Sequence, residues 1–214
     1  MTNRFFHIFD LAKYLRKRKM KKIYKDQLRA YINHIVPITE FDWSLFDQRL
    51  YYKEYNKNDL LSETGEVENY IYFIVEGVAR ICHYKKGVEY TLRFNFPISI
   101  FNSYSSFVSR TPSLICVEAL TELKLFRMSY MDMQTLYNES PTAERVGRRM
   151  VELLYVQREM KELQMHTRTA EDYYNELVKT SPDLIEKIPQ KHLASYLGIT
   201  PESLSRIKKK IVGC

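Results

Sequence analysis

The spacing of the apolar residues changes at Pro141 and divides the chain into a strand-rich part and a helical part. Before this point, residues 47–135 contain β-branched and aromatic runs such as NYIYFIVEGVARICHY, interrupted at Gly77 and at Lys86-Gly87. Short runs separated by turn residues are typical of antiparallel strands in a barrel or sandwich. After Pro141, apolar residues recur every three or four positions through residue 165, which predicts one long amphipathic helix.

The helix predicted for residues 141–166 carries one apolar side. Its members are Val146, Met150, Leu153, Met160 and Leu163. Such a side can pack on its own domain, or it can pair with the same side of a second copy. We favour the pairing and expect a homodimer whose dimerisation helix spans residues 141–166.

A second helical pattern lies near the C-terminus, in the segment QKHLASYLGITPESLSRIKKKI of residues 190–211. The small side chain of Ala194 lets another helix approach closely, and Gly198 permits the left-handed residue that ends a helix. Thr200 can cap the next helix, and Pro201 suits its first position. The apolar contacts between the two helices are expected from Leu193, Leu197, Ile199, Leu204 and Ile207. This pattern predicts a helix-turn-helix.

The second of these helices has side chains suited to duplex DNA. Glu202, Ser205 and Arg206 lie within about one turn and can reach base edges, since Arg pairs with guanine and Glu with cytosine. The residues expected at the phosphates, which position the helix without reading sequence, are Ser203, Lys208, Lys209 and Lys210. The helix-capping Thr200 is also a candidate DNA-binding residue. The plain alternative is a surface helical hairpin with solvated charges.

The net charge of the chain also favours a nucleic-acid partner. The chain has a formal net charge of +7 and a pI near 9.1, which favours nucleic acid or an acidic membrane surface. Residues 1–25 combine Phe5, Phe6 and Phe9 with a basic run from Lys13 to Lys22. This basic extension can be an amphipathic helix that touches membrane or DNA, or a frayed, solvated segment.

Several classes of protein are disfavoured. Cys82, Cys116 and Cys214 lie far apart without a CxxC spacing, which argues against a disulfide framework or structural zinc and fits a reducing cytoplasm. No apolar run reaches the roughly 20 residues needed to cross a bilayer. No catalytic constellation, cofactor motif or metal-ligand pattern is visible, so we expect a soluble cytoplasmic protein that is not an enzyme.

Taken with these motifs, the chain resembles the cyclic-AMP receptor and fumarate-nitrate regulator (Crp/Fnr) family over most of residues 45–211. LLSETGEVENYIYFIVEGVARI resembles its early strands, and Glu202, Ser205 and Arg206 match the E-x-x-S-R pattern of the fumarate-nitrate branch. The resemblance implies an α+β fold, with a β-roll effector domain over residues 26–140. The dimerisation helix follows, and a helix-turn-helix DNA-binding domain completes the chain over 167–214. The β-hairpin wing is expected to be truncated or absent.

The effector cassette departs from the family pattern. Asn102 and Ser103 stand where cyclic-nucleotide binders have Gly-Glu, and Pro112-Ser113 stand where they have Arg-Ser. A cyclic phosphate therefore loses its charged partner, unless Arg110 substitutes for it. We take Asn102, Ser103, Arg110 and Ser113 as the candidate effector pocket and expect no affinity for cyclic AMP.

The resulting hypothesis is a bacterial transcription regulator that binds a pseudo-palindromic site as a homodimer. Its expected partners are double-stranded DNA, a second copy of itself, RNA polymerase, and an unknown small-molecule effector or none. One alternative is a ligand-binding or protein-interaction module with vestigial DNA binding. Another is an enzyme that uses the β-roll as a substrate pocket.

Overall fold

The computed structural model describes residues 3–180 and 182–212, with the backbone alone for 3–17, 183–184 and 211–212. Its N-terminal helices are α1 (Asn3–Ile35) and α2 (Glu40–Asp47). The strands and the helix among them are β1 (Tyr51–Tyr55), β2 (Leu60–Ser62), β3 (Tyr70–Glu76), β4 (Ala79–Lys85), β5 (Val88–Asn95), β6 (Ser99–Phe101), α3 (Tyr104–Ser109), β7 (Cys116–Ala119) and β8 (Leu123–Ser129). The later helices are α4 (Tyr130–Glu139), α5 (Pro141–Thr167), α6 (Ala170–Thr180), α7 (Pro182–Ile185), α8 (Gln190–Tyr196) and α9 (Pro201–Val212).

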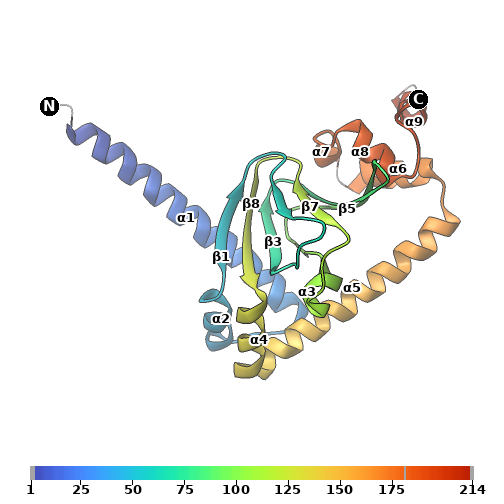
Figure 1. Cartoon of the computed structure of the whole chain (residues 1–214). Coiled ribbons are helices and arrows are strands. Elements are labelled where there is room, and N and C mark those ends of the chain that lie inside the picture. Colours follow the sequence, from blue (N-terminus) through green and yellow to red (C-terminus); the bar gives the residue numbers. More distant parts are fainter. Residues whose placement is uncertain (1–2, 181, 213–214) are drawn as a thin grey trace.

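The strands form two four-stranded antiparallel sheets, ordered β1-β8-β3-β6 and β2-β7-β4-β5. We call these sheet A and sheet B, and together they make the β-roll of Figure 1. Its interior is apolar and is filled from both sheets by Tyr72, Ile74, Ala79, Ile81, Phe101, Val117, Ala119, Leu123 and Leu125. The antiparallel strands predicted for residues 47–135 are confirmed between Tyr51 and Ser129. Two parts of that range are helical, because Tyr104–Ser109 form α3 and residues 130–135 belong to α4.

Turn residues hold the hairpins as the sequence predicts. Gly77, between β3 and β4, has a φ of +91°, and a Cβ at this position would lie 2.2 Å from the carbonyl oxygen of Glu122. Lys86 and Gly87 have φ values of 51° and 77° at the tip of the β4–β5 hairpin. Two successive left-handed residues make the turn type that matches the twist of a two-stranded ribbon.

Helix α1 crosses the boundary expected between residues 25 and 26. Tyr24, Leu28 and Ile32 recur every four residues on one side of α1, and all three are buried in a core with Phe73 and Phe126 of sheet A. This apolar side continues the helix across the expected boundary, and Figure 1 shows its first half extending beyond the β-roll. The aromatic side chains expected at residues 5, 6 and 9 lie outside the described side chains.

Helix α5 divides along its length into a buried and an exposed part. Ser140 caps its first turn, because its hydroxyl accepts from the amide of Ala143 at 3.1 Å. Val146 and Met150 pack into the core beneath α1 and α4, whereas Leu153, Met160 and Leu163 are exposed. The apolar side predicted to run from Val146 to Leu163 is therefore split, and its first two members pack on their own chain.

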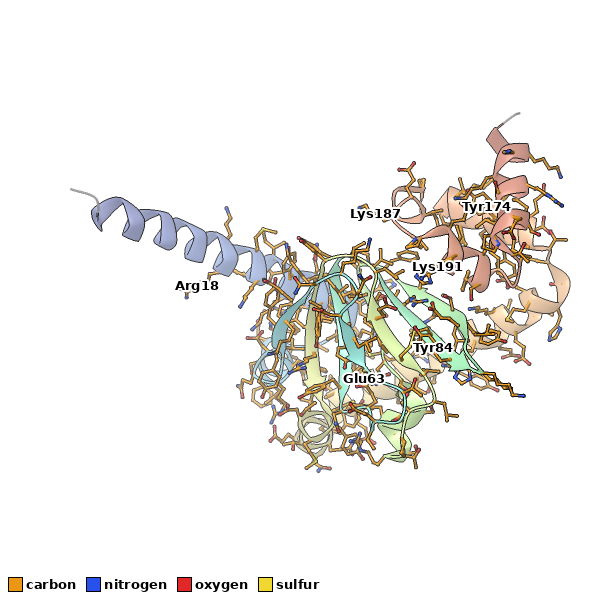
Figure 2. The ribbon with its side chains drawn as sticks, turned by 45° about the horizontal axis from the view of Figure 1, so that its top comes forward. Arg18, Glu63, Tyr84, Tyr174, Lys187 and Lys191 are labelled. Carbon is orange, nitrogen blue, oxygen red and sulfur yellow. A yellow bond between two sulfur atoms is a disulfide. The ribbon has the colours of Figure 1, made fainter. Side chains whose placement is uncertain are left out.

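The C-terminal helices α6–α9 form a smaller core that merges with one end of the β-roll. Leu193 and Leu204 from these helices are fully buried together with Val78 and Leu120 from the strand connections. Phe94 of β5 contacts Tyr196 of α8, with ring centres 5.1 Å apart. Figure 2 shows these helices beside the β-roll, with Tyr174 of α6 and Lys191 of α8 labelled.

One expectation about cysteine is wrong. Cys82 and Cys116 form a disulfide although 34 positions separate them. The two residues are directly paired on neighbouring strands β4 and β7, which sequence spacing alone does not reveal. Cys214 lies outside the described residues.

Within residues 3–180 and 182–212, no helix is long and apolar enough to cross a membrane. The same residues contain no group of three or more His, Cys, Asp or Glu side chains placed to hold a metal ion.

Candidate nucleic-acid interface and effector site

Helices α8 and α9 meet through small and apolar side chains. Leu193, Ala194 and Leu204 have no exposed surface at this contact. Gly198 has a φ of +69° and ends the connection after α8, and the amide of Ile199 donates to the carbonyl of Ala194 at 3.0 Å. The left-handed glycine turns the chain sharply, so α9 begins beside α8.

Thr200 and Glu202 organise the start of α9. The Thr200 hydroxyl accepts from the amide of Ser203 at 3.3 Å, as an N-cap residue does. The pKa of Glu202 is lowered by its own backbone amide, by the Thr200 hydroxyl and by the charge of Arg206. The carboxylate is therefore ionised at neutral pH and can accept hydrogen bonds.

The candidate DNA-binding residues do not share one environment. Glu202, Arg206 and Lys209 are exposed at spacings of four and three residues, so they form one line along α9. Ser203 and Ser205 are half-buried. Lys208 is also half-buried, and its ammonium lies 5.9 Å from the ring centre of Tyr174.

Lys210 is held by the neighbouring helix. Its ammonium donates to both carboxylate oxygens of Glu171 in α6, at 2.7 and 3.0 Å. A lysine engaged in this way supports the packing of α9 on α6.

Three of the four candidate effector residues converge at the start of α3. The Ser103 and Ser113 hydroxyls are 2.8 Å apart, and both residues are buried. Asn102 donates from its side-chain amide to the carbonyl of Tyr70 at 3.1 Å. These contacts satisfy the polar groups internally, within strands and loops of the β-roll.

A carboxylate occupies the same place. Glu68, in the loop before β3, is only 2% exposed. It accepts from the Tyr70 amide at 3.0 Å, from the Tyr72 hydroxyl at 3.1 Å, and from the Ser103 amide at 3.5 Å. Burial raises the pKa of Glu68, while these donors and the Ser62 side chain oppose that rise. A carboxyl group of the chain itself thus lies in the cassette region.

Arg110 is engaged elsewhere. Its guanidinium donates to the carbonyls of Glu68 and Phe107 at 2.7 and 3.0 Å, and to the side chain of Asn69 at 2.6 Å. It also lies 4.2 Å from the ring centre of Tyr130. Arg110 therefore ties α3 to the loop before β3 and to α4.

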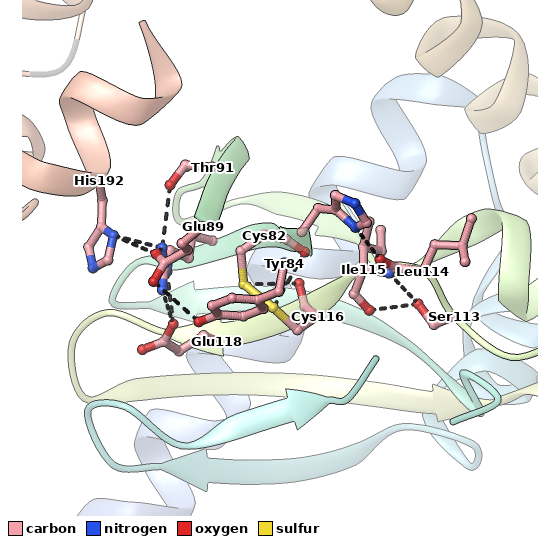
Figure 3. The surroundings of a disulfide bond; sticks show 12 residues. Cys82, Tyr84, Glu89, Thr91, Ser113, Leu114, Ile115, Cys116, Glu118 and His192 are labelled. Carbon is pink, nitrogen blue, oxygen red and sulfur yellow. Dashed lines mark hydrogen bonds and ion pairs between the residues drawn. A yellow bond between two sulfur atoms is a disulfide. The ribbon is translucent and has the colours of Figure 1, made fainter. Parts of the chain in front are cut away.

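The structure also reveals a buried charged cluster that sequence reasoning missed. Arg80 of β4 is 2% exposed and donates to Glu118 of β7 at 2.5 and 2.8 Å. It also contacts Glu89 of β5 and His192 of α8, the latter at 2.7 Å. Glu89, Glu118 and His192 are labelled in Figure 3. A charged residue inside an apolar strand run was the one available indication, since only the fold brings Arg80 to His192, 112 positions away.

His192 is neutral in this cluster. Burial, and then the charges of Arg80 and Lys191, lower its pKa to about 4. The unprotonated Nδ1 atom accepts from Arg80. Glu89, whose Oε1 lies 2.9 Å from the same nitrogen, is consequently held by Arg80 and forms no ion pair with His192.

Comparison with protein families matches the β-roll to a known domain. Residues 52–140 match the model of the cyclic nucleotide-binding domain. This segment has the cyclic nucleotide-binding fold. A search of the curated proteins found no match to the chain.

Solved structures extend the likeness beyond the β-roll. The c-di-GMP responsive global regulator CLP of Xanthomonas campestris is 16% identical with a TM-score of 0.64, covering 82% of this chain and 92% of its own. FixK2 from Bradyrhizobium japonicum is 15% identical with a TM-score of 0.63, covering 77% and 85%. The catabolite activator protein of Thermus thermophilus is 17% identical with a TM-score of 0.53, covering 86% and 87%. The chain thus shares the fold of Crp/Fnr-type regulators.

An apolar cavity lined by described residues lies outside the cassette of the cyclic nucleotide-binding fold. It has a volume of about 70 Å³ between sheet A and helices α1, α4 and α5. Leu28, Phe126, Leu136 and Val146 are among its lining residues, whereas Asn102, Ser103, Arg110 and Ser113 are not. The candidate effector pocket of the sequence analysis is therefore a packed hydrogen-bonded cluster.

Proposed function

We propose that this chain is a sequence-specific DNA-binding transcription regulator that acts as a homodimer. The observation that carries the proposal is the exposed line of Glu202, Arg206 and Lys209 on α9, whose opposite side is buried through Leu204. An ionised carboxylate and a guanidinium one turn apart offer an acceptor and a paired donor to base edges in a major groove. The net charge of +7 and the shared fold support the same reading.

The dimer is proposed from the second part of α5. Leu153, Val156, Met160 and Leu163 are between 45% and 55% exposed and follow one another at spacings of three, four and three residues. This is the spacing of a coiled-coil seam. Pairing two copies along it would give two recognition helices related by a two-fold axis, as binding to half-sites about 34 Å apart requires.

We propose further that cyclic AMP is not the effector. The buried Glu68 carboxyl already lies in the cassette region and accepts from the Ser103 amide, so a cyclic phosphate would have to displace it. We also propose that the protein is not an enzyme. In this proposal it acts in the cytoplasm and regulates transcription through RNA polymerase.

The base-reading assignment is tested with two variants of α9. Arg206→Ala should weaken binding to the preferred operator by about 1–3 kcal/mol and relax discrimination at one base pair of each half-site. Lys209→Ala should weaken binding about equally on operator and random duplex. It should also reduce the slope of log K against log salt by about one per contact. Both variants are measured on both duplexes at several salt concentrations.

If Arg206→Ala lowers the affinity for operator and random duplex by the same factor, Arg206 contacts phosphate alone and the proposed reading is wrong. If the wild type prefers no duplex over another, the protein-interaction alternative replaces the proposal.

The effector assignment is tested by titration calorimetry with cyclic AMP. We expect no saturable heat with the wild-type protein. Tight binding at one site per chain would show that Glu68 is displaced and that Arg110 leaves its present partners to hold the phosphate.

A further inference from the structure

The disulfide of sheet B lies in the middle of a strand pair. Cys82 of β4 and Cys116 of β7 are directly opposite each other, with their Cα atoms 5.2 Å apart. The two residues are 0% and 3% exposed. Their bond therefore joins neighbouring strands within the sheet and does not staple a loop.

The adjacent pair on the same face is the one that contacts α8. Residues two apart on a strand project to the same side, so Arg80 and Glu118 lie beside Cys82 and Cys116. Arg80 is held by Glu118 and contacts His192 of α8 at 2.7 Å. Figure 3 shows Glu118 and His192 near the disulfide.

The other neighbour of Cys82 also contacts α8. Thr91 of β5 is paired with Cys82, and its amide donates to the Ser195 hydroxyl at 2.9 Å. That hydroxyl donates in turn to the carbonyl of Glu89 at 3.2 Å. Two polar contacts of α8 thus lie next to Cys82 on sheet B. His192 contacts Arg80 of β4, and Ser195 contacts Thr91 of β5.

We propose that Cys82 and Cys116 are a reversible oxidation site that controls how tightly α8 is held on sheet B. The oxidant we assign is a peroxide, because the buried sulfurs admit only a small molecule. A Cys thiolate attacks one oxygen of hydrogen peroxide, the O–O bond breaks, and a sulfenic acid and water form. The second thiol then attacks the sulfenic sulfur, the S–S bond forms, and a second water leaves. Two thiols thus lose two electrons and two protons to one peroxide, and an added dithiol reverses the change.

The physical link is the spacing of the two strands. A bond between Cys82 and Cys116 prevents β4 and β7 from separating, which keeps Arg80 within reach of Glu118 and in position for His192. With both thiols reduced, the strands separate locally at a lower free energy, and α8 loses a fixed partner. This inference concerns the docking of α8 and does not depend on DNA binding.

The experiment compares the two redox states of the full chain carrying Cys214→Ser, which leaves Cys82 and Cys116 as its cysteines. Protein reduced with dithiothreitol is treated with hydrogen peroxide, and free thiols are then alkylated and located by mass spectrometry. We expect peroxide to protect both cysteines from alkylation and dithiothreitol to restore them. Amide hydrogen exchange over residues 88–95 should be about tenfold slower in the oxidised protein.

The double variant Cys82→Ser/Cys116→Ser is the control and should exchange at the reduced rate with and without peroxide. Ser195→Ala should raise exchange in both redox states, because it removes the acceptor of the Thr91 amide. Alkylation of both cysteines after peroxide would overturn the oxidation site. A disulfide that forms without slowing exchange over residues 88–95 would overturn its control of α8.

Discussion

At the scale of single residues, the molecule depends on buried polar and charged groups that are hydrogen-bonded. Arg80 and Glu68 are each 2% exposed, and each is surrounded by specific donors or acceptors. Removing one partner of the buried Arg80–Glu118 ion pair is strongly destabilising, by about 3–5 kcal/mol, since the other is left charged and desolvated. Both residues therefore fix the conformation of the β-roll.

His192 predicts a pH dependence of stability. Its pKa is about 4 in the folded chain, below the ordinary value of 6.5, because of burial and the charges of Arg80 and Lys191. Above pH 6.5 the ring is neutral in both states, and its contribution to stability is complete. As the pH falls from 6.5 toward 4, the unfolded chain binds a proton that the folded chain does not, so stability is lost.

Urea unfolding at about pH 7.5 and pH 5 checks this sign in the wild type and in His192→Gln. The glutamine keeps an acceptor for Arg80 but does not titrate. We expect the wild type to lose more stability than the variant over this interval. Equal losses would mean that His192 is protonated in the folded chain.

Roles that depend on neighbouring residues in the sequence could be predicted. Roles that depend on which strands pair, and in which register, could not. Thr200, Pro201 and Gly198 act within their own helix ends, where neighbouring positions decide the conformation. Glu68 reaches Ser103 across 35 positions, and this contact depends on how the strands pair. The structure brings Asn102, Ser103 and Ser113 together, and the nearby Glu68 carboxyl is not predictable from their local sequence.

At the scale of elements, hairpin geometry separates two kinds of glycine. Gly77 and Gly87 have φ values of +91° and +77°, but a Cβ would meet the Glu122 carbonyl at 2.2 Å only at Gly77. At Gly87 no atom lies within 4 Å of such a Cβ. Gly87→Ala should therefore lower the free energy of unfolding by about 1 kcal/mol through backbone strain. Gly77→Ala should lower it by about 3 kcal/mol or more, since its neighbour is backbone.

Thermal or urea unfolding of both variants measures the difference. Similar losses at the two positions would show that Glu122 moves away freely. Both substitutions would then cost only the backbone strain of a positive φ, which the two glycines share.

The apolar pattern of α5 predicts the helix but does not predict which of its turns are buried. Its period predicted a helix over residues 141–165, and the helix extends to Thr167. The same period could not say which turns meet the chain's own core. That depends on α1 and α4, which cover Val146 and leave the turns after Met150 outside.

At the scale of the whole molecule, the proposed dimer can be tested at the exposed turns of α5. Sedimentation at micromolar concentration should give about twice the chain mass of 25.7 kDa. Leu153→Glu should shift the equilibrium to monomer, since two like charges would face each other across the seam. Tyr155→Glu adds the same charge to an exposed position on another side of the helix and should leave the dimer intact.

A wild-type chain that sediments as a monomer, with and without DNA, contradicts the dimer. Equal dissociation by both substitutions would place the contact on a broader surface of α5 than the proposed seam.

The order of the parts could be predicted from hydrophobic spacing, because a period of two and a period of 3.6 residues are local properties. The attachment of α8 to β5 and the pairing of Cys82 with Cys116 could not. Both depend on which strands become neighbours after the chain has folded.

The pairing of β1 with β8 determines how late in synthesis sheet A can form. Tyr51 is paired with Arg127, and Leu60 of β2 with Glu118, so the first strands wait for the last ones to leave the ribosome. Contacts so distant in sequence make folding slow, since a long loop must close before any pairing energy is gained. Until then the apolar side of α1, with Leu28 and Ile32, has no sheet to cover it. The apolar side of α1 in the nascent chain thus stays uncovered until β8 has been synthesised, and such a surface is prone to aggregate.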